Sequence, residues 1–178
     1  MLLCPECEPN YHPILSKQDS EIWYATEYTD EFAKVINSYK ENGRVALVNH
    51  LALALDQLLS RALDHSTFSE IVFTQSSRAN FRKRGFNPMK FLLSKSKIAT
   101  DFKLKELKLI REVNDQSNLN RHERVGNVAG AFRAASDLDR VLLLDDIRST
   151  GATLEAMATA VEETGGQVVG RAVLAINF

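Results

Sequence analysis

Two adjacent carboxylates, Asp145 and Asp146, lie between an apolar run and a loop of small and hydroxylated residues. The apolar run, residues 141–144, predicts a buried strand of a parallel sheet that ends on the carboxylates. The loop, residues 148–153, precedes a stretch with helical periodicity, so converging backbone N–H groups and the helix dipole favour a bound phosphate. Because carboxylates repel phosphate, Asp145 and Asp146 must bind another part of the same ligand. The segment therefore predicts a site for a sugar with two vicinal hydroxyl groups and a 5′-phosphate.

A purely structural role is the alternative for this segment, since Asp residues often end a strand and cap a helix. A cap needs neither the second Asp nor the hydroxyl series Ser149, Thr150 and Thr153, which favours the ligand site. The segment lacks the Gly-Lys-Ser/Thr of a Walker loop and the Gly-x-Gly-x-x-Gly of a dinucleotide loop. Those two kinds of nucleotide site are therefore not expected here.

The same segment resembles the phosphoribosyl pyrophosphate (PRPP) signature of type I phosphoribosyltransferases, which is an apolar strand, Asp-Asp and a Thr-Thr-Gly-like loop. The resemblance implies that Asp145 and Asp146 are the catalytic pair and contact the ribose 2′- and 3′-hydroxyls. It also implies a cradle for the 5′-phosphate, made of Arg148, Ser149, Thr150, Gly151, Ala152 and Thr153.

A basic stretch follows the predicted strand at residues 71–74. No acidic residue occurs between Glu70 and Asp101, and the basic residues of that interval are Arg78, Arg82, Lys83, Arg84, Lys90, Lys95 and Lys97. Such a one-sided cluster after a buried strand predicts a site for a multiply charged anion. The alternative is a solvated basic helix that keeps the protein in solution.

The elements that must position these residues follow from periodicity and from start and stop signals. Strands are expected at residues 21–28, 71–74, 107–113, 141–144 and 168–176. Helices are expected after Thr29, over residues 45–63, after Asn87 and from Thr153 to the Gly165-Gly166 pair. The alternation from residue 71 onward predicts an α/β fold, with a mainly parallel sheet flanked by helices and the ligand at the carboxyl ends of its strands.

Length and composition fit one ordinary globular domain. The 178 residues are 44% hydrophobic and 25% charged, and 22 Lys and Arg residues face 23 Asp and Glu residues. No apolar run approaches the roughly 20 residues that span a bilayer, and no signal peptide is apparent. We expect a leader over residues 1–20, a single domain over residues 21–178 and a cytoplasmic location.

The leader carries the only two cysteines, Cys4 and Cys7, in a Cys-x-x-Cys spacing that suits zinc. A structural zinc site needs four ligands, and His12 is the only nearby third candidate. The alternative is a pair of ordinary thiols, so zinc is not expected.

The later segments resemble the ComF family, which is named for a DNA-uptake competence protein. The resemblance rests on Ser77-Arg78, on Arg82-Lys-Arg-Gly-Phe-Asn87 and on a third motif. The third motif comprises Gln116, Leu119, Arg124, Asn127, Val128, Gly130, Ala131 and Phe132. Two features depart from the family: Phe73-Thr74-Gln75 replaces Pro-Val-Pro, and a four-cysteine zinc module is reduced to Cys4 and Cys7.

This resemblance implies an enzyme with the type I phosphoribosyltransferase fold that transfers a phosphoribosyl group to a nitrogen acceptor and releases pyrophosphate, with Mg²⁺ as cofactor. The implied pyrophosphate loop is Gln75, Ser76, Ser77 and Arg78, with Arg78 as its main side chain. A flexible hood over residues 114–124, with Gln116, Arg121 and Arg124, is implied to exclude water during the reaction.

The partners expected are PRPP, an acceptor that the sequence does not identify, a second copy of the chain as a homodimer, and the DNA-uptake machinery. No membrane segment is expected. The alternative is a non-catalytic protein that senses PRPP or assists DNA uptake, which the altered residues 73–75 favour. A formal net charge of −1 weakens the case for a free-standing DNA-binding protein.

Overall fold

The computed structural model of the chain describes residues 17–19, 22–111, 113 and 126–178. Its strands are β1 (Lys17–Asp19), β2 (Ile22–Glu27), β3 (Glu70–Thr74), β4 (Lys103–Leu109), β5 (Phe132–Arg133), β6 (Arg140–Arg148) and β7 (Gln167–Ile176). Its helices are α1 (Asp30–Lys40), α2 (Val48–Leu63), α3 (Arg78–Arg84), α4 (Pro88–Leu93) and α6 (Ala152–Glu162), with 3₁₀ turns η1 (Val45–Leu47) and η2 (Ala99–Asp101).

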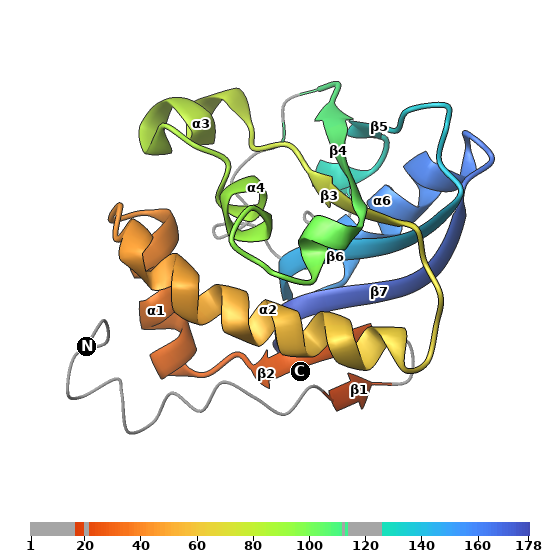
Figure 1. The fold of residues 1–178 in the computed structure, drawn as a ribbon. Coiled ribbons are helices and arrows are strands. Elements are labelled where there is room, and N and C mark those ends of the chain that lie inside the picture. The colour runs from red at the N-terminus through yellow and green to blue at the C-terminus, as the bar shows by residue number, and fades with distance from the viewer. Residues whose placement is uncertain (1–16, 20–21, 112, 114–125) are drawn as a thin grey trace.

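The strands form one seven-stranded sheet in the order β1-β2-β7-β6-β3-β4-β5 (Figure 1). The pairs β2–β7, β7–β6, β6–β3 and β3–β4 are parallel, whereas β1 and β5 are added to the two edges antiparallel. Parallel strands need crossover connections, and here helices make them. The expected α/β fold with a mainly parallel sheet flanked by helices is confirmed.

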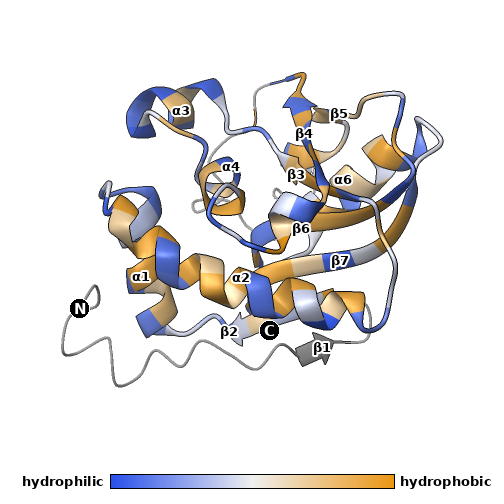
Figure 2. Ribbon diagram, in the orientation of Figure 1, coloured by the Kyte–Doolittle hydropathy of each residue, from blue (hydrophilic) through white to orange (hydrophobic). Residues whose placement is uncertain are grey.

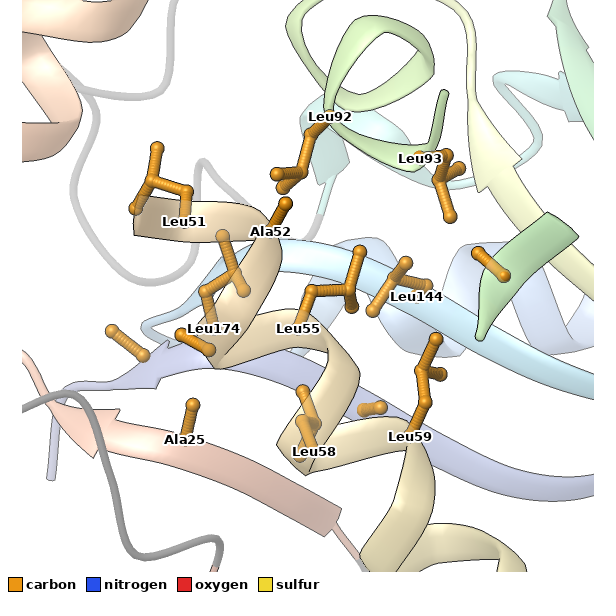
Figure 3. Close-up of a cluster of buried hydrophobic side chains, with 14 of the residues drawn as sticks. Ala25, Leu51, Ala52, Leu55, Leu58, Leu59, Leu92, Leu93, Leu144 and Leu174 are labelled. Atoms are coloured by element: carbon orange, nitrogen blue, oxygen red, sulfur yellow. The ribbon is translucent and has the colours of Figure 1, made fainter. Parts of the chain in front are cut away.

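Both faces of the sheet are covered, which explains the uninterrupted apolar runs of β6 and β7. Alternate residues of β6 face opposite layers: Leu142 and Leu144 pack with α1, α2 and α4, whereas Val141 and Leu143 pack with α6. Figure 3 shows side chains of α2, among them Leu55, pointing toward Leu144 within the first of these clusters. A fully buried Leu contributes roughly 1.5–3 kcal/mol, so these two layers hold the strands in place.

Local patterns predicted most helices well. Thr29 caps α1, with its hydroxyl accepting a hydrogen bond from the Phe32 backbone N–H, and the predicted face of α1 is buried. Helix α6 buries its four predicted residues, Leu154, Met157, Ala158 and Val161. Asn87 caps α4 with Pro88 as the first helical residue, as predicted. None of the helices in the described ranges has the length and apolar character needed to cross a membrane.

Two predicted strand boundaries are wrong. The strand predicted to end on the carboxylates continues to Arg148, because β6 pairs with β7 as far as Arg148 and Ile176. The strand predicted at residues 107–113 is instead β4, which begins at Lys103, because residues 103–107 pair with β3. Lys17–Asp19, from the expected leader, pairs with β2. Cys4, Cys7 and the hood residues Gln116, Arg121 and Arg124 lie outside the described residues.

Candidate functional site

A cleft of about 720 Å³ opens at the carboxyl edge of the sheet. Residues at or just beyond the carboxyl ends of five strands line it: Tyr28 after β2, Thr74 and Gln75 at β3, Leu109 at β4, Asp145 and Asp146 near the end of β6, and Asn177 after β7. In open parallel sheets this edge is where ligands bind, because helices begin there and backbone N–H groups point outward. The cleft therefore lies where the fold predicts a ligand.

The turn between β6 and α6 forms one wall of the cleft. Gly151 has a φ of 80° and is the N-cap of α6, so this position needs a residue that accepts left-handed backbone angles. Ser149 and Thr153 line the cleft, and the Thr150 hydroxyl accepts a hydrogen bond from the Ala152 backbone N–H at 3.3 Å. The N-terminus of an eleven-residue helix thus points toward the cleft. Such a turn favours an anion.

Asp145 and Asp146 both line the cleft, although they still belong to β6. One carboxylate oxygen of Asp145 accepts a hydrogen bond from the Asp146 backbone N–H at 2.9 Å. Burial, followed by the negative charge of Asp146, raises the pKa of Asp145 from 3.8 to about 7. Asp145 is therefore protonated in part near neutral pH, in a cleft that both carboxylates line.

A lysine that is distant in the sequence, Lys40, forms an ion pair with Asp146. The Lys40 ammonium, at the end of α1, donates a hydrogen bond to Asp146 Oδ2 at 2.5 Å. Both side chains are mostly buried, with 20% and 24% exposed. Burial opposes the charged form of Lys40, but the Asp146 charge and hydrogen bond outweigh it and raise the Lys40 pKa. The buried Tyr39 hydroxyl fixes this end of α1 by donating to the Pro88 carbonyl at 2.7 Å.

The loop after β3 forms the opposite wall. Gln75, Ser76 and Ser77 line the cleft, and the Ser77 hydroxyl caps α3 by accepting a hydrogen bond from the Asn80 N–H at 3.2 Å. Gln75 is fixed to β4 by hydrogen bonds that join its N–H to the Leu107 carbonyl and its Oε1 to the Leu109 N–H. Arg78 begins α3, is exposed, and does not line the cleft.

The structure brings together the predicted carboxylates, Ser149 and Thr153 of the turn after β6, and the loop at residues 75–77. The other predicted cradle residues do not line the cleft: Arg148, which ends β6, Thr150, Gly151 and Ala152. The structure adds Lys40 and Glu41, which the sequence did not single out, and it places Lys83 and Arg84 of the predicted basic stretch in the lining of the same cleft. Lys40 and Asp146 are 106 residues apart, so no local pattern signals their pairing. Arg84 belongs to the predicted basic stretch and to the motif Arg82-Lys-Arg-Gly-Phe-Asn87, but that motif contains Arg82 as well and does not show which of its basic residues lines the cleft.

The raised pKa of Asp145 leads to a prediction about stability. Between about pH 4 and 7 the folded protein holds more proton on Asp145 than the unfolded chain does, so the free energy of unfolding falls as pH rises through this range. The Asp145→Asn variant lacks this titration. It should be more stable than the wild type by roughly 1–3 kcal/mol at about pH 8 and differ less near pH 4.

Urea unfolding at both pH values measures this difference. Asp139→Asn is the matched control, because Asp139 is an exposed carboxylate just before the opposite end of the same strand. If Asp145→Asn and Asp139→Asn changed the free energy of unfolding equally, burial of the Asp145 charge would not be what lowers the stability of the wild type.

Neither a family model nor a curated protein matches this chain. Solved structures similar to it include adenine phosphoribosyltransferase from Saccharomyces cerevisiae, with 14% identity over 75% of this chain and 69% of that one and a TM-score of 0.47. Adenine phosphoribosyltransferase from Leishmania tarentolae has 12% identity over 92% and 94%, with a TM-score of 0.48. A purine phosphoribosyltransferase from Pyrococcus horikoshii Ot3 has 18% identity over 74% and 82%, with a TM-score of 0.37.

Proposed function

We propose that this chain binds PRPP and transfers its phosphoribosyl group to a nitrogen acceptor with release of pyrophosphate. The observation that carries the proposal is the content of one cleft: an acid pair, a helix-capping turn suited to phosphate and a polar loop beside a basic helix. These three parts match the three chemical parts of PRPP, which are vicinal hydroxyls, a monoester phosphate and a diphosphate.

Each part of the site has a proposed role. Asp145 and Asp146 accept hydrogen bonds from the ribose 2′- and 3′-hydroxyls. The turn formed by Arg148, Ser149, Thr150, Gly151, Ala152 and Thr153 binds the 5′-phosphate. The loop formed by Gln75, Ser76, Ser77 and Arg78 binds the diphosphate. The motifs quoted above support membership of the ComF family and a hood that contains Gln116, Arg121 and Arg124.

The proposed reaction breaks the bond between the ribose C1 and the diphosphate oxygen and forms a bond between C1 and the acceptor nitrogen. Positive charge develops on the ribose ring and negative charge on the departing diphosphate. In this proposal, the carboxylates on the ribose side and the basic residues on the diphosphate side stabilise these opposite charges. Hood closure would exclude the water that hydrolyses PRPP.

The acid pair is chemically suited to Mg²⁺, which binds proteins through one or two carboxylates and completes its coordination with substrate phosphates and water. Asp145 and Asp146 are the residues that would hold it. Within the described ranges, no group of three or more His, Cys, Asp or Glu residues is arranged to hold a metal ion. When bound, Mg²⁺ supplies positive charge that neutralises the diphosphate leaving group.

A PRPP sensor without turnover is the second candidate. Phe73-Thr74-Gln75 replaces the Pro-Val-Pro of the ComF family. The Gln75 side chain already accepts a hydrogen bond from the Leu109 backbone N–H. In this second candidate, the loop held by Gln75 binds the diphosphate but does not support its release. Binding alone would then remain.

Calorimetry and a turnover assay test both candidates. With Mg²⁺ present, the protein should bind PRPP and ribose 5-phosphate, and it should release pyrophosphate from PRPP with one acceptor from a panel of nucleobases, glutamine and ammonia. PRPP binding with no turnover for any acceptor would favour the sensor. Absence of binding to both ligands would refute the proposed function.

A further inference from the structure

Arg84 differs from the other basic residues of α3 in its surroundings. No residue of α3 is fully buried, and Figure 2 shows this helix as largely hydrophilic. The Arg84 side chain is nevertheless only 11% exposed, whereas that of its neighbour Lys83 is 66% exposed. Gly85 follows with a φ of 78° and ends the helix, which leaves Arg84 at the edge of the cleft that it lines.

The Arg84 guanidinium has donor capacity that the described residues do not satisfy. Its Nη2 donates to Glu41 Oε1, while its buried Nε has no hydrogen-bond partner within the described residues. Buried donors are normally paired, and an unpaired donor on a charged group is especially unfavourable. Because this Nε is closed off from solvent, an anionic ligand would supply the missing acceptor once the guanidinium turns from Glu41 toward the cleft.

Glu41 holds the two cations of this wall together. It accepts hydrogen bonds from Arg84 and, at 2.9 Å, from the Lys83 ammonium. Burial would raise the Glu41 pKa, but the hydrogen bonds and charges of Lys83 and Arg84 lower it, so the carboxylate stays ionised. The Glu41 carboxylate is therefore the counter-ion of Lys83 and Arg84 at the edge of the cleft.

The end of α1 thus supplies a counter-ion to each of two charged groups that line the cleft: the acid pair Asp145 and Asp146, here called the acidic wall, and Lys83 and Arg84, here called the basic wall. Lys40 pairs with Asp146 on the acidic wall, and the next residue, Glu41, pairs with Arg84 and Lys83 on the basic wall. The Arg84 charge also acts on Lys40, because it opposes Lys40 protonation, which places these groups in one electrostatic cluster. A ligand that binds both walls must replace these internal counter-ions.

We propose that Arg84, assisted by Lys83, is the side chain that binds the diphosphate of PRPP, and that Glu41 competes for it in the free protein. This inference rests on the proposed function and assigns the cation to Arg84 rather than to the exposed Arg78. The planar guanidinium fork matches phosphate oxygens in pairs, and a diphosphate carries more negative charge than one carboxylate. The diphosphate therefore displaces Glu41.

Calorimetry of Arg84→Gln with three probes tests the assignment: PRPP, inorganic pyrophosphate and ribose 5-phosphate, each with Mg²⁺. We expect affinity for PRPP and pyrophosphate to fall about tenfold to a hundredfold, with ribose 5-phosphate changing less than about threefold. Arg82→Gln removes the same charge from an exposed position of the same helix and should leave all three affinities within about threefold. Retained ribose 5-phosphate binding shows that Arg84→Gln is folded.

Glu41→Gln tests the competition separately. Removing the carboxylate charge should strengthen pyrophosphate and PRPP binding severalfold, because Arg84 and Lys83 are released, and should leave ribose 5-phosphate binding unchanged. Weaker pyrophosphate binding would mean that Glu41 orients Arg84, and the competition would be refuted.

The outcomes separate this inference from the proposed function. If the wild type binds PRPP and pyrophosphate, but Arg84→Gln behaves like Arg82→Gln or loses all three ligands equally, only the Arg84 assignment fails. A wild type that binds none of the three probes would overturn both.

Discussion

Replacing Asp145 and Asp146 together with Asn is expected to abolish binding of both PRPP and ribose 5-phosphate without unfolding the protein. Each lost hydrogen bond to a charged acceptor costs about 1.5–3 kcal/mol, which is roughly tenfold to over a hundredfold in affinity. Both ligands should be affected, because both carry the ribose hydroxyls. Calorimetry with Mg²⁺ measures the loss.

The fold should survive this double substitution for reasons visible in the structure. Asn at position 145 keeps an oxygen that can accept the Asp146 N–H hydrogen bond and removes the charge that burial disfavours. Asn at position 146 deprives Lys40 of its anion, so part of the stability gain is offset. Asp139→Asn, at the other end of β6, is the control and should bind both ligands normally. Unchanged affinity in the double variant would refute the ribose assignment.

Gly151→Val is expected to remove binding of sulfate, phosphate, ribose 5-phosphate and PRPP together. A Cβ at this position would lie 3.7 Å from Arg148 Nε, an ordinary contact, so crowding inside the free protein is not the main effect. The φ of 80° instead makes a β-branched residue unfavourable by about 1–2 kcal/mol, and relaxing that strain would redirect the N–H groups at the start of α6. The added side chain also limits how closely an anion can approach.

Gly165→Val is the matched control for this effect. Gly165 has a φ of 85°, lies just beyond the other end of α6, and has open space around the position of a Cβ. Both variants should therefore melt a few degrees below the wild type, and only Gly151→Val should lose the anions. If a folded Gly151→Val protein bound phosphate normally, the turn would only connect β6 to α6, and its assignment as the phosphate site would be refuted.

Much of the local structure follows from the sequence alone. The apolar faces of α1 and α6 have helical spacing, and burial of those faces is what makes short helices stable. The run at residues 141–144 is apolar on both sides, which is sufficient to predict a strand covered on both faces. Gly151 lies where the chain turns from strand to helix, and its positive φ explains why glycine occurs there.

Strand ends were decided by neighbouring strands. The polar residues 145–148 continue β6 because β7 supplies hydrogen-bond partners as far as Ile176. Lys103 and Lys105 begin β4, although their exposed or half-exposed side chains give little apolar signal, because β3 pairs with them. Backbone hydrogen bonds between strands do not depend on side-chain type, so composition does not reveal where they stop.

The sequence by itself identified the carboxylates, the turn after them and a basic stretch, because each is a contiguous set of residue types. Only the tertiary structure selected Arg84 from that stretch and placed Lys40 on Asp146 and Glu41 on Arg84. These pairs join segments separated by 106 and 43 residues. Their partners meet because α1 and α3 end at the same edge of the sheet, and electrostatic attraction depends on distance in space, not along the chain.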